Sequence, residues 1–342
     1  MQTESNSYIS SSDSAGVKTK PAAAVIKAAV GLLLAFAVML LFEAVFQNNG
    51  SVVERKRMIE LRADNSIDVL FIGNSHAYCT FDPAFISGTI GKRAYNAALP
   101  DQKIDTVYYN LKELLDRQKP EIVVLEAFSF GRSNSEYQGY VANIDALDFS
   151  PDKIKACFEI FPDKFEAVRM LSSLYRCHGN WKKPEIVKKN IKYLLGMTAG
   201  APDKDGFYGL GSKMSEETIE KYRASQDSKF TPVIDEYSIG YFNRIVKLCR
   251  DKNIRLIVAM APFNNIYQEK VQYRNIYDKM LGVCTDAGVE YLDFNMLYDQ
   301  LQLDFGDFED AFHNAQHMNK WGAEKVSRYL AQYLAQNPTP NP

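Results

Sequence analysis

Five short apolar runs organise the chain after residue 66, and segments with helical periodicity lie between them. The third and fourth runs are rich in Val, Ile and Leu without alternation, as expected for parallel strands covered on both faces. We predict strands at 67–72, 93–97, 122–125, 255–259 and 290–294. Apolar residues recur three and four positions apart in the intervening segments, which is typical of amphipathic helices. We predict such helices at 104–118, 239–252, 276–287 and 322–334.

This alternation predicts an α/β fold with a doubly wound, parallel, five-stranded sheet and right-handed crossovers. One segment, about 128–238, does not follow it. Within this segment, 153–176 and 184–195 have helical patterns, whereas 199–213 is rich in Gly, Asp and Lys and predicts a loop. We interpret 128–238 as a helical insertion over the carboxyl edge of the sheet. It either shapes a substrate cleft or forms a peripheral cap.

An apolar segment at 22–46 precedes the alternating region. It carries no charge between residues 28 and 42, and its length matches the roughly 20 residues that a bilayer span needs. No Ala-x-Ala-like cleavage site follows, so we predict one retained transmembrane helix, with a buried helix of a soluble protein as the alternative. The remaining divisions are a disordered cytoplasmic tail (1–21), a connector (47–66), the α/β domain (67–336) and a short tail (337–342).

Composition excludes several classes of function. The formal net charge of −2 gives no reason to expect a nucleic-acid partner. Five scattered cysteines form no CxxC pair, and we expect them to be buried thiols. The chain has no phosphate loop, zinc motif or dinucleotide fingerprint, so we predict neither a cofactor nor a metal.

Two distant segments carry candidate chemistry. The first predicted strand ends in Gly73-Asn74-Ser75-His76, which places a serine at the carboxyl end of a parallel strand, where α/β sheets hold their sites. A serine nucleophile needs a base, and the base needs an orienting acceptor. His317, just before the last predicted helix, could be the base, and Asn314 is well placed by a tight turn to orient it. The alternative for Ser75 is an ordinary helix-capping serine.

These segments resemble the SGNH/GDSL hydrolase superfamily, which comprises serine esterases and acyltransferases on a flavodoxin-like fold. Residues 68–76 are similar to its first block, 94–99 to its second, 119–125 to the following strand and 307–325 to its last block. The resemblance implies that Ser75 is the nucleophile and His317 the base. The nearest branch is the membrane-anchored bacterial one that is associated with cell-surface acyl modification.

The chain departs from the family pattern in its acid and its oxyanion donors. Asn314 stands where the family has Asp, so Asp310 or Asp307 could supply the charge instead. Asp310 and His313 also form a competing Asp-x-x-His pair, although Asn319 and Gly322 match the family spacing after His317.

The oxyanion donors implied by the resemblance are the Ser75 N–H, the N–H of Ala98 or Leu99, and the Asn96 side chain. Glu126-Ala127-Phe128 replaces the family's Gly-x-Asn-Asp and removes a side-chain donor. His76, next to the nucleophile, is expected to point away from it as a polar loop residue.

The resemblance therefore implies a serine-dependent esterase or O-acyltransferase that works through an acyl-serine intermediate. Its expected substrates are acylated cell-surface polysaccharides or small esters, and a membrane-embedded acyl-donor enzyme is an expected partner. The expected location is the cell membrane, single-pass, with the globular domain outside the cytoplasm. The alternative is a catalytically degenerate carbohydrate-binding or assembly module at the membrane surface.

Overall fold

The computed structural model describes residues 21–63, 66–133, 138–197, 205–225, 231–311 and 316–338. The chain divides into two units, Met1–Ala44 and Val45–Pro342. The described part of the first unit belongs to helix α1 (Pro21–Phe46), whose side chains are exposed from Ala23 to Phe42. From Ala23 to Phe46 this helix is long and apolar enough to cross a membrane.

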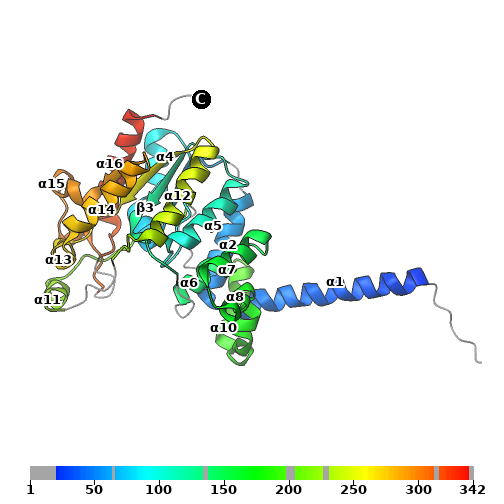
Figure 1. Ribbon diagram of the computed structural model, residues 1–342. Helices are drawn as coiled ribbons and strands as arrows, with labels where there is room; N and C mark the ends of the chain where they lie inside the picture. Colours follow the sequence, from blue (N-terminus) through cyan, green and yellow to red (C-terminus); the bar gives the residue numbers. More distant parts are fainter. Residues whose placement is uncertain are drawn as a thin grey trace, which may run out of the picture. The chain divides into compact units, whose positions relative to one another are not determined.

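The second unit is built on a five-stranded, all-parallel sheet with the order β2-β1-β3-β4-β5, so the predicted α/β class is confirmed (Figure 1). The strands are β1 (Val69–Ile72), β2 (Ala94–Asn96), β3 (Ile122–Glu126), β4 (Arg255–Met260) and β5 (Glu290–Asp293). Every residue of β1 and β3 is buried, as their apolar runs predict. The chain leaves β1 toward β2 on one side and returns to β3 on the other, which places a topological switch point at the end of β1.

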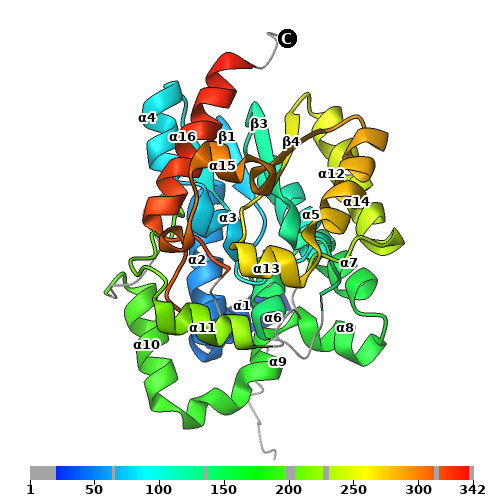
Figure 2. The same cartoon turned by 90° about the vertical axis from the view of Figure 1, so that its left-hand side faces the viewer.

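Helices cover both faces of the sheet (Figure 2). One face carries α4 (Pro83–Ile90) and α16 (Lys320–Gln336), which pack against each other. The other face carries α5 (Ile104–Leu115) and α12 (Glu236–Asp251), which also pair, and α14 (Tyr273–Asp286) packs against β5. Helices α5, α12, α14 and α16 lie where the apolar periodicity predicts them, whereas α4 was not predicted.

Most of residues 47–66, the predicted connector, form α2 (Asn49–Ala63), a helix of the second unit. Its Val52, Met58 and Leu61 are buried in the core. Three of the charged residues of α2 are themselves buried: Arg57 pairs with Glu54 at 2.8 Å, and Arg62 pairs with Glu113 at 2.7 Å. Internal pairing lets a highly charged sequence occupy the interior.

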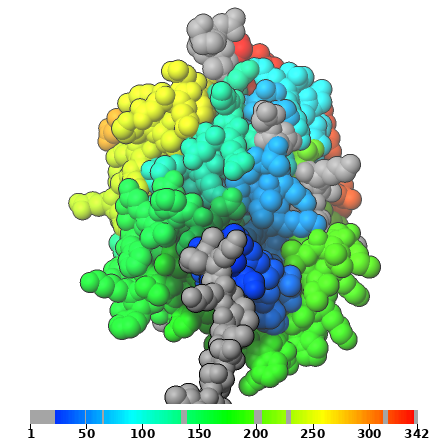
Figure 3. Space-filling view, turned by 90° about the vertical axis from the view of Figure 1, so that its right-hand side faces the viewer, coloured from blue at the N-terminus to red at the C-terminus, as the bar shows by residue number. Residues whose placement is uncertain are grey.

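The insertion is helical, as predicted, but the expected helix at 153–176 is broken into three. Pro162 and the capping Asp163, whose carboxylate accepts the N–H of Glu166 at 2.9 Å, end one helix and start the next. The helices are α6 (Gln138–Asp145), α7 (Pro151–Ile160), α8 (Lys164–Leu171), α9 (Ser173–Cys177), η2 (His178–Lys182), α10 (Pro184–Leu194) and α11 (Glu216–Ala224). Both α6 and α10 pack against α2, and Figure 3 shows the insertion's surface in green.

Candidate active site

Ser75 is the first residue of a short helix, α3 (Ser75–Thr80), that follows β1 after a two-residue turn. Asn74 caps α3, because its Oδ1 accepts the N–H of His76 at 3.0 Å. Gly73 has φ 142°, and a Cβ there would lie 2.7 Å from the Cβ of Glu126. Only glycine fits this turn without strain, so the turn fixes Ser75 at the switch point of the sheet.

His317 lies in the loop before α16, and Asn319 organises this loop. The Oδ1 of Asn319 accepts the N–H groups of Trp321 and Gly322, each at 3.1 Å, while its Nδ2 donates to the carbonyls of Gly306, Phe308 and Ser212. The His317 carbonyl accepts the N–H of Glu309 at 3.0 Å. These bonds fix the backbone of His317 from both sides.

The Ser75 Oγ and the His317 Nε2 lie 2.8 Å apart, although 242 positions separate the two residues in the chain. Both side chains are partly exposed. Helix α16 packs against α3, and Ser327 of α16 donates to the Thr80 carbonyl at 3.2 Å and accepts the Asp82 N–H at 2.9 Å. The predicted serine and imidazole are therefore within reach for direct proton transfer.

The imidazole of His317 lies against an aromatic wall. The His76 ring is 4.8 Å from the His317 ring, 4.2 Å from Phe128 and 5.2 Å from Phe263, measured between centroids. His76 is buried, so the expectation of a polar loop residue is wrong: the first turn of α3 directs its ring into the wall behind His317. Phe128 and Phe263, which follow the carboxyl ends of β3 and β4, were not among the predicted site residues.

Burial lowers the pKa of His317 to about 4, so the imidazole is neutral at pH 7 and its Nε2 can accept the proton of Ser75. Burial also lowers the pKa of His76 well below its ordinary value, and His317 and Lys103 lower it further. Both rings are neutral under physiological conditions, which suits a base that must start unprotonated.

Neither carboxylate proposed as an alternative acid reaches His317. The Asp310 carboxylate instead accepts the N–H and the hydroxyl of Ser215, at 3.0 and 2.9 Å. Asp307 accepts from Lys325 at 2.7 Å and from the Asp304 N–H at 2.9 Å. Across the described ranges no acceptor binds the Nδ1 of His317, while Asn314 and His313 lie outside the described residues.

The Ser75 N–H has no acceptor within the described part of the chain, so it can donate to an oxyanion. The other predicted donors are occupied. The Ala98 N–H donates to the Asn96 Oδ1 at 3.2 Å, and the Asn96 Nδ2 donates to the carbonyls of Ala77 and Phe81. The Leu99 N–H donates to the Gly73 carbonyl at 3.1 Å. This geometry does not support the oxyanion roles expected for Ala98, Leu99 and Asn96.

Two further titratable groups lie in the same region. Glu126 ends β3 in full burial, where it accepts the Phe128 N–H at 3.0 Å and where desolvation raises its pKa to about 8. The Nζ of Lys103 lies 5.8 Å from the centroid of the Phe128 ring, and burial lowers its pKa. Glu126 lies at the end of a strand and Lys103 directly precedes α5, and the sequence assigned neither residue a role.

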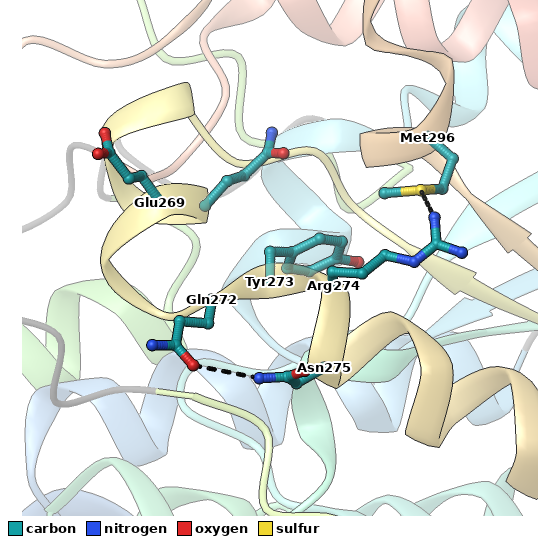
Figure 4. A pocket seen from close by; sticks show the side chains of 7 residues that line it. Glu269, Gln272, Tyr273, Arg274, Asn275 and Met296 are labelled. Atoms are coloured by element: carbon teal, nitrogen blue, oxygen red, sulfur yellow. Dashed lines mark hydrogen bonds between the residues drawn. The ribbon is translucent and has the colours of Figure 1, made fainter.

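A separate open pocket of about 500 Å³ lies at the start of α14 (Figure 4). Its lining includes Gln272, Arg274 and Met296, and Tyr273 donates beneath it to the Asp293 carboxylate at 2.5 Å. None of the lining residues belongs to the Ser75–His317 site, so this pocket is distinct from that site.

Comparison with protein-family models finds no match, and no curated protein matches the chain significantly. Among the described residues, no group of three or more His, Cys, Asp or Glu side chains is arranged to hold a metal ion. The five cysteines are buried free thiols, as expected. The site is therefore interpreted from its own geometry.

Proposed function

We propose that the protein is a serine-dependent esterase or O-acyltransferase of the SGNH/GDSL type. The Ser75 Oγ attacks an ester carbonyl while the His317 Nε2 takes its proton, and the Ser75 N–H stabilises the oxyanion. His317 returns the proton to the departing alkoxide, which leaves an acyl-serine. Water or a sugar hydroxyl then attacks this ester and regenerates Ser75. The observation that carries the proposal is the 2.8 Å contact between Ser75 and His317.

The fold and the apolar helix are consistent with this function. The strand order β2-β1-β3-β4-β5 is that of flavodoxin-like sheets, in which ligands bind outside the carboxyl ends of the strands at the switch point. We propose that α1 is a single-pass anchor that holds the globular unit at the outer surface of the cell membrane. Acylated surface glycans are then the accessible substrates, an argument by analogy.

One observation favours a second candidate, a glycan-binding or assembly module that has lost catalysis. No described carboxylate contacts His317, so no fixed negative charge is seen to stabilise the imidazolium that forms during acyl transfer. In serine hydrolases with a full triad, replacing the acid by an amide lowers kcat by about 10⁴. The binding module would keep the fold and lack turnover.

A fluorophosphonate probe separates the two candidates, because it forms a covalent bond only with an activated serine. We expect labelling of the full-length chain in detergent, complete loss of labelling in Ser75→Ala and strong loss in His317→Ala. Ser215→Ala is the matched control, since its hydroxyl binds Asp310 outside the site and its loss should leave labelling unchanged. A well-folded wild-type protein that takes up no probe would refute the enzyme and favour the binding module.

A further inference from the structure

The insertion is bonded to the end of the apolar helix. Asn190 of α10 is buried, and its Nδ2 donates to the carbonyls of Val45 and Gln47 at 2.9 and 2.8 Å. Asn180 donates in the same way to the Phe46 carbonyl at 2.9 Å. These amides satisfy carbonyls at the carboxyl end of α1 that the helix itself leaves without partners. Because Val45, Phe46 and Gln47 belong to the second unit, α10 and η2 lie beside the point at which the chain passes from the first unit to the second.

Exposed apolar side chains gather in this same part of the globular unit. Of the sixteen large hydrophobic side chains that are exposed in its described residues, eleven lie between residues 149 and 197. They include Phe149, Phe158, Phe165, Trp181, Ile191 and Leu195. Phe165 is 87% exposed and Trp181 is 62% exposed, which is unusual for aromatic side chains on a water-facing surface. Such a concentration marks an interaction surface.

The charge around these residues matches a phospholipid interface. Residues 181–195 contain five lysines and one carboxylate, that of Glu185. Ile191 and Leu194 of α10 are exposed, as is Leu195 directly after the helix. The same helix exposes three lysines, Lys188, Lys189 and Lys192. A helix with an apolar side and a lysine-rich side is typical of segments that lie in the plane of the membrane surface. Trp181 precedes this helix, and tryptophan is enriched at that boundary.

We propose that the surface formed by residues 149–197, the insertion surface, docks onto the bilayer that holds α1. This inference rests on the membrane anchor of the proposed function. The bilayer is favoured over a protein partner because α1 delivers the insertion surface to it at high effective concentration. Docking would hold the globular unit in one orientation on the bilayer. The Ser75 site would then stay at a fixed height above the lipid headgroups.

The two tryptophans of the chain, Trp181 and Trp321, allow a direct test in the full-length protein. Trp321→Phe leaves only Trp181, on the insertion surface, and Trp181→Phe leaves only Trp321, beside the candidate site. Each variant is placed in phospholipid nanodiscs with ordinary or brominated acyl chains, since bromine quenches tryptophan on contact. We expect a roughly twofold or greater loss of Trp181 emission in brominated discs, because interfacial aromatic rings reach the acyl boundary. Trp321 emission should not change.

A double substitution tests whether the apolar residues cause the docking. Ile191→Ser with Leu195→Ser, in the Trp321→Phe background, should at least halve the quenching. Leu281→Ser should leave it unchanged, because this leucine of α14 lies outside the insertion surface and is 40% exposed, close to the 41% of Ile191. Equal Trp181 emission in both lipids, or quenching of Trp321 instead, would overturn the proposal.

Alkaline carbonate extraction separates this failure from failure of the anchor. A chain that resists extraction but shows no Trp181 quenching has an anchor and no docking. A chain released by carbonate lacks the anchor, and this result overturns the docking proposal. Fluorophosphonate labelling reports on the serine chemistry independently of the extraction and the quenching.

Discussion

The guanidinium of Arg57 donates to the backbone carbonyl of Asn96 at 2.9 Å and so bonds α2 to the end of β2. It also donates to the Ala98 carbonyl, and it pairs with Glu54 at 2.8 Å. One residue further along, the Leu99 N–H binds the Gly73 carbonyl in the turn that carries Ser75. Helix α2 is therefore linked to the candidate nucleophile through a short chain of buried hydrogen bonds.

Replacing Arg57 should disturb both folding and the site. Arg57→Ala leaves the Glu54 carboxylate and two carbonyls buried without their partner, and breaking a buried pair in this way costs about 3 kcal/mol or more of unfolding free energy. Urea unfolding would measure the loss. Glu60→Ala removes an exposed charge of the same helix and should change stability by no more than about 0.5 kcal/mol. Equal stability of the two variants would contradict a structural role for Arg57.

Reactivity at Ser75 should persist to unusually low pH. The neutral form of His317 is the base, and with a pKa of about 4 it predominates at every pH above that value. The rate of fluorophosphonate labelling should therefore be nearly flat from pH 7 to 5 and should fall about tenfold per pH unit below 4. A decline centred near pH 6.5 would show that a negative charge stabilises the His317 imidazolium.

Stability should depend on pH for the same reason. Between pH 4 and 6.5 the unfolded chain binds protons at His317 that the folded chain excludes, so the free energy of unfolding should rise with pH across this window. His317→Phe removes this contribution, and its melting temperature should be less sensitive to pH in the same range. An unchanged slope in this variant would assign the effect to other groups.

The carboxylate of Asp310 should be dispensable for reactivity. It is exposed and bound to Ser215, so Asp310→Asn should change the labelling rate by less than about threefold. Asp307→Asn should lower stability more, because Asp307 is buried between Lys325 and the Asp304 N–H. A loss of labelling by two or more orders of magnitude in folded Asp310→Asn would mean that Asp310 reaches His317 during the reaction.

The turn before Ser75 should not tolerate a side chain. Gly73→Ala combines a φ of 142° with a Cβ placed 2.7 Å from the Glu126 Cβ, and we expect a loss of about 2 kcal/mol or more in the free energy of unfolding. Gly88→Ala is the matched control, since Gly88 is exposed in α4 with no atom near the added methyl group. This control should gain about 0.5–1 kcal/mol through helix propensity. Chemical denaturation followed by circular dichroism measures both.

The strands and the serine–histidine pair could be predicted from the sequence because strong local signals mark them. Uninterrupted apolar runs locate β1 and β3, and the abrupt end of the first run at Gly73 places Ser75 at a strand end. The pairing with His317 came from spacing that resembles a known family, and the 2.8 Å contact agrees with it.

The parts that could not be predicted depend on long-range pairing. Charged residues such as Glu54, Arg57 and Arg62 are typical of a solvent-exposed segment. Only their buried partners show that they lie in the interior. The same holds for Asn96, whose amide could serve an oxyanion or the backbone, and which binds the carbonyls of Ala77 and Phe81. Side-chain direction in a loop, as for Asp310, is likewise set by whatever packs against it, here the start of α11.

The 242 positions between Ser75 and His317 have a consequence for biosynthesis. The serine leaves the ribosome early, soon after α1, whereas its base arrives only when the segment before α16 has been made. Under the proposed function, a nascent chain would therefore lack acyl-transfer activity until the segment before α16 has been made, because Ser75 has no base before then.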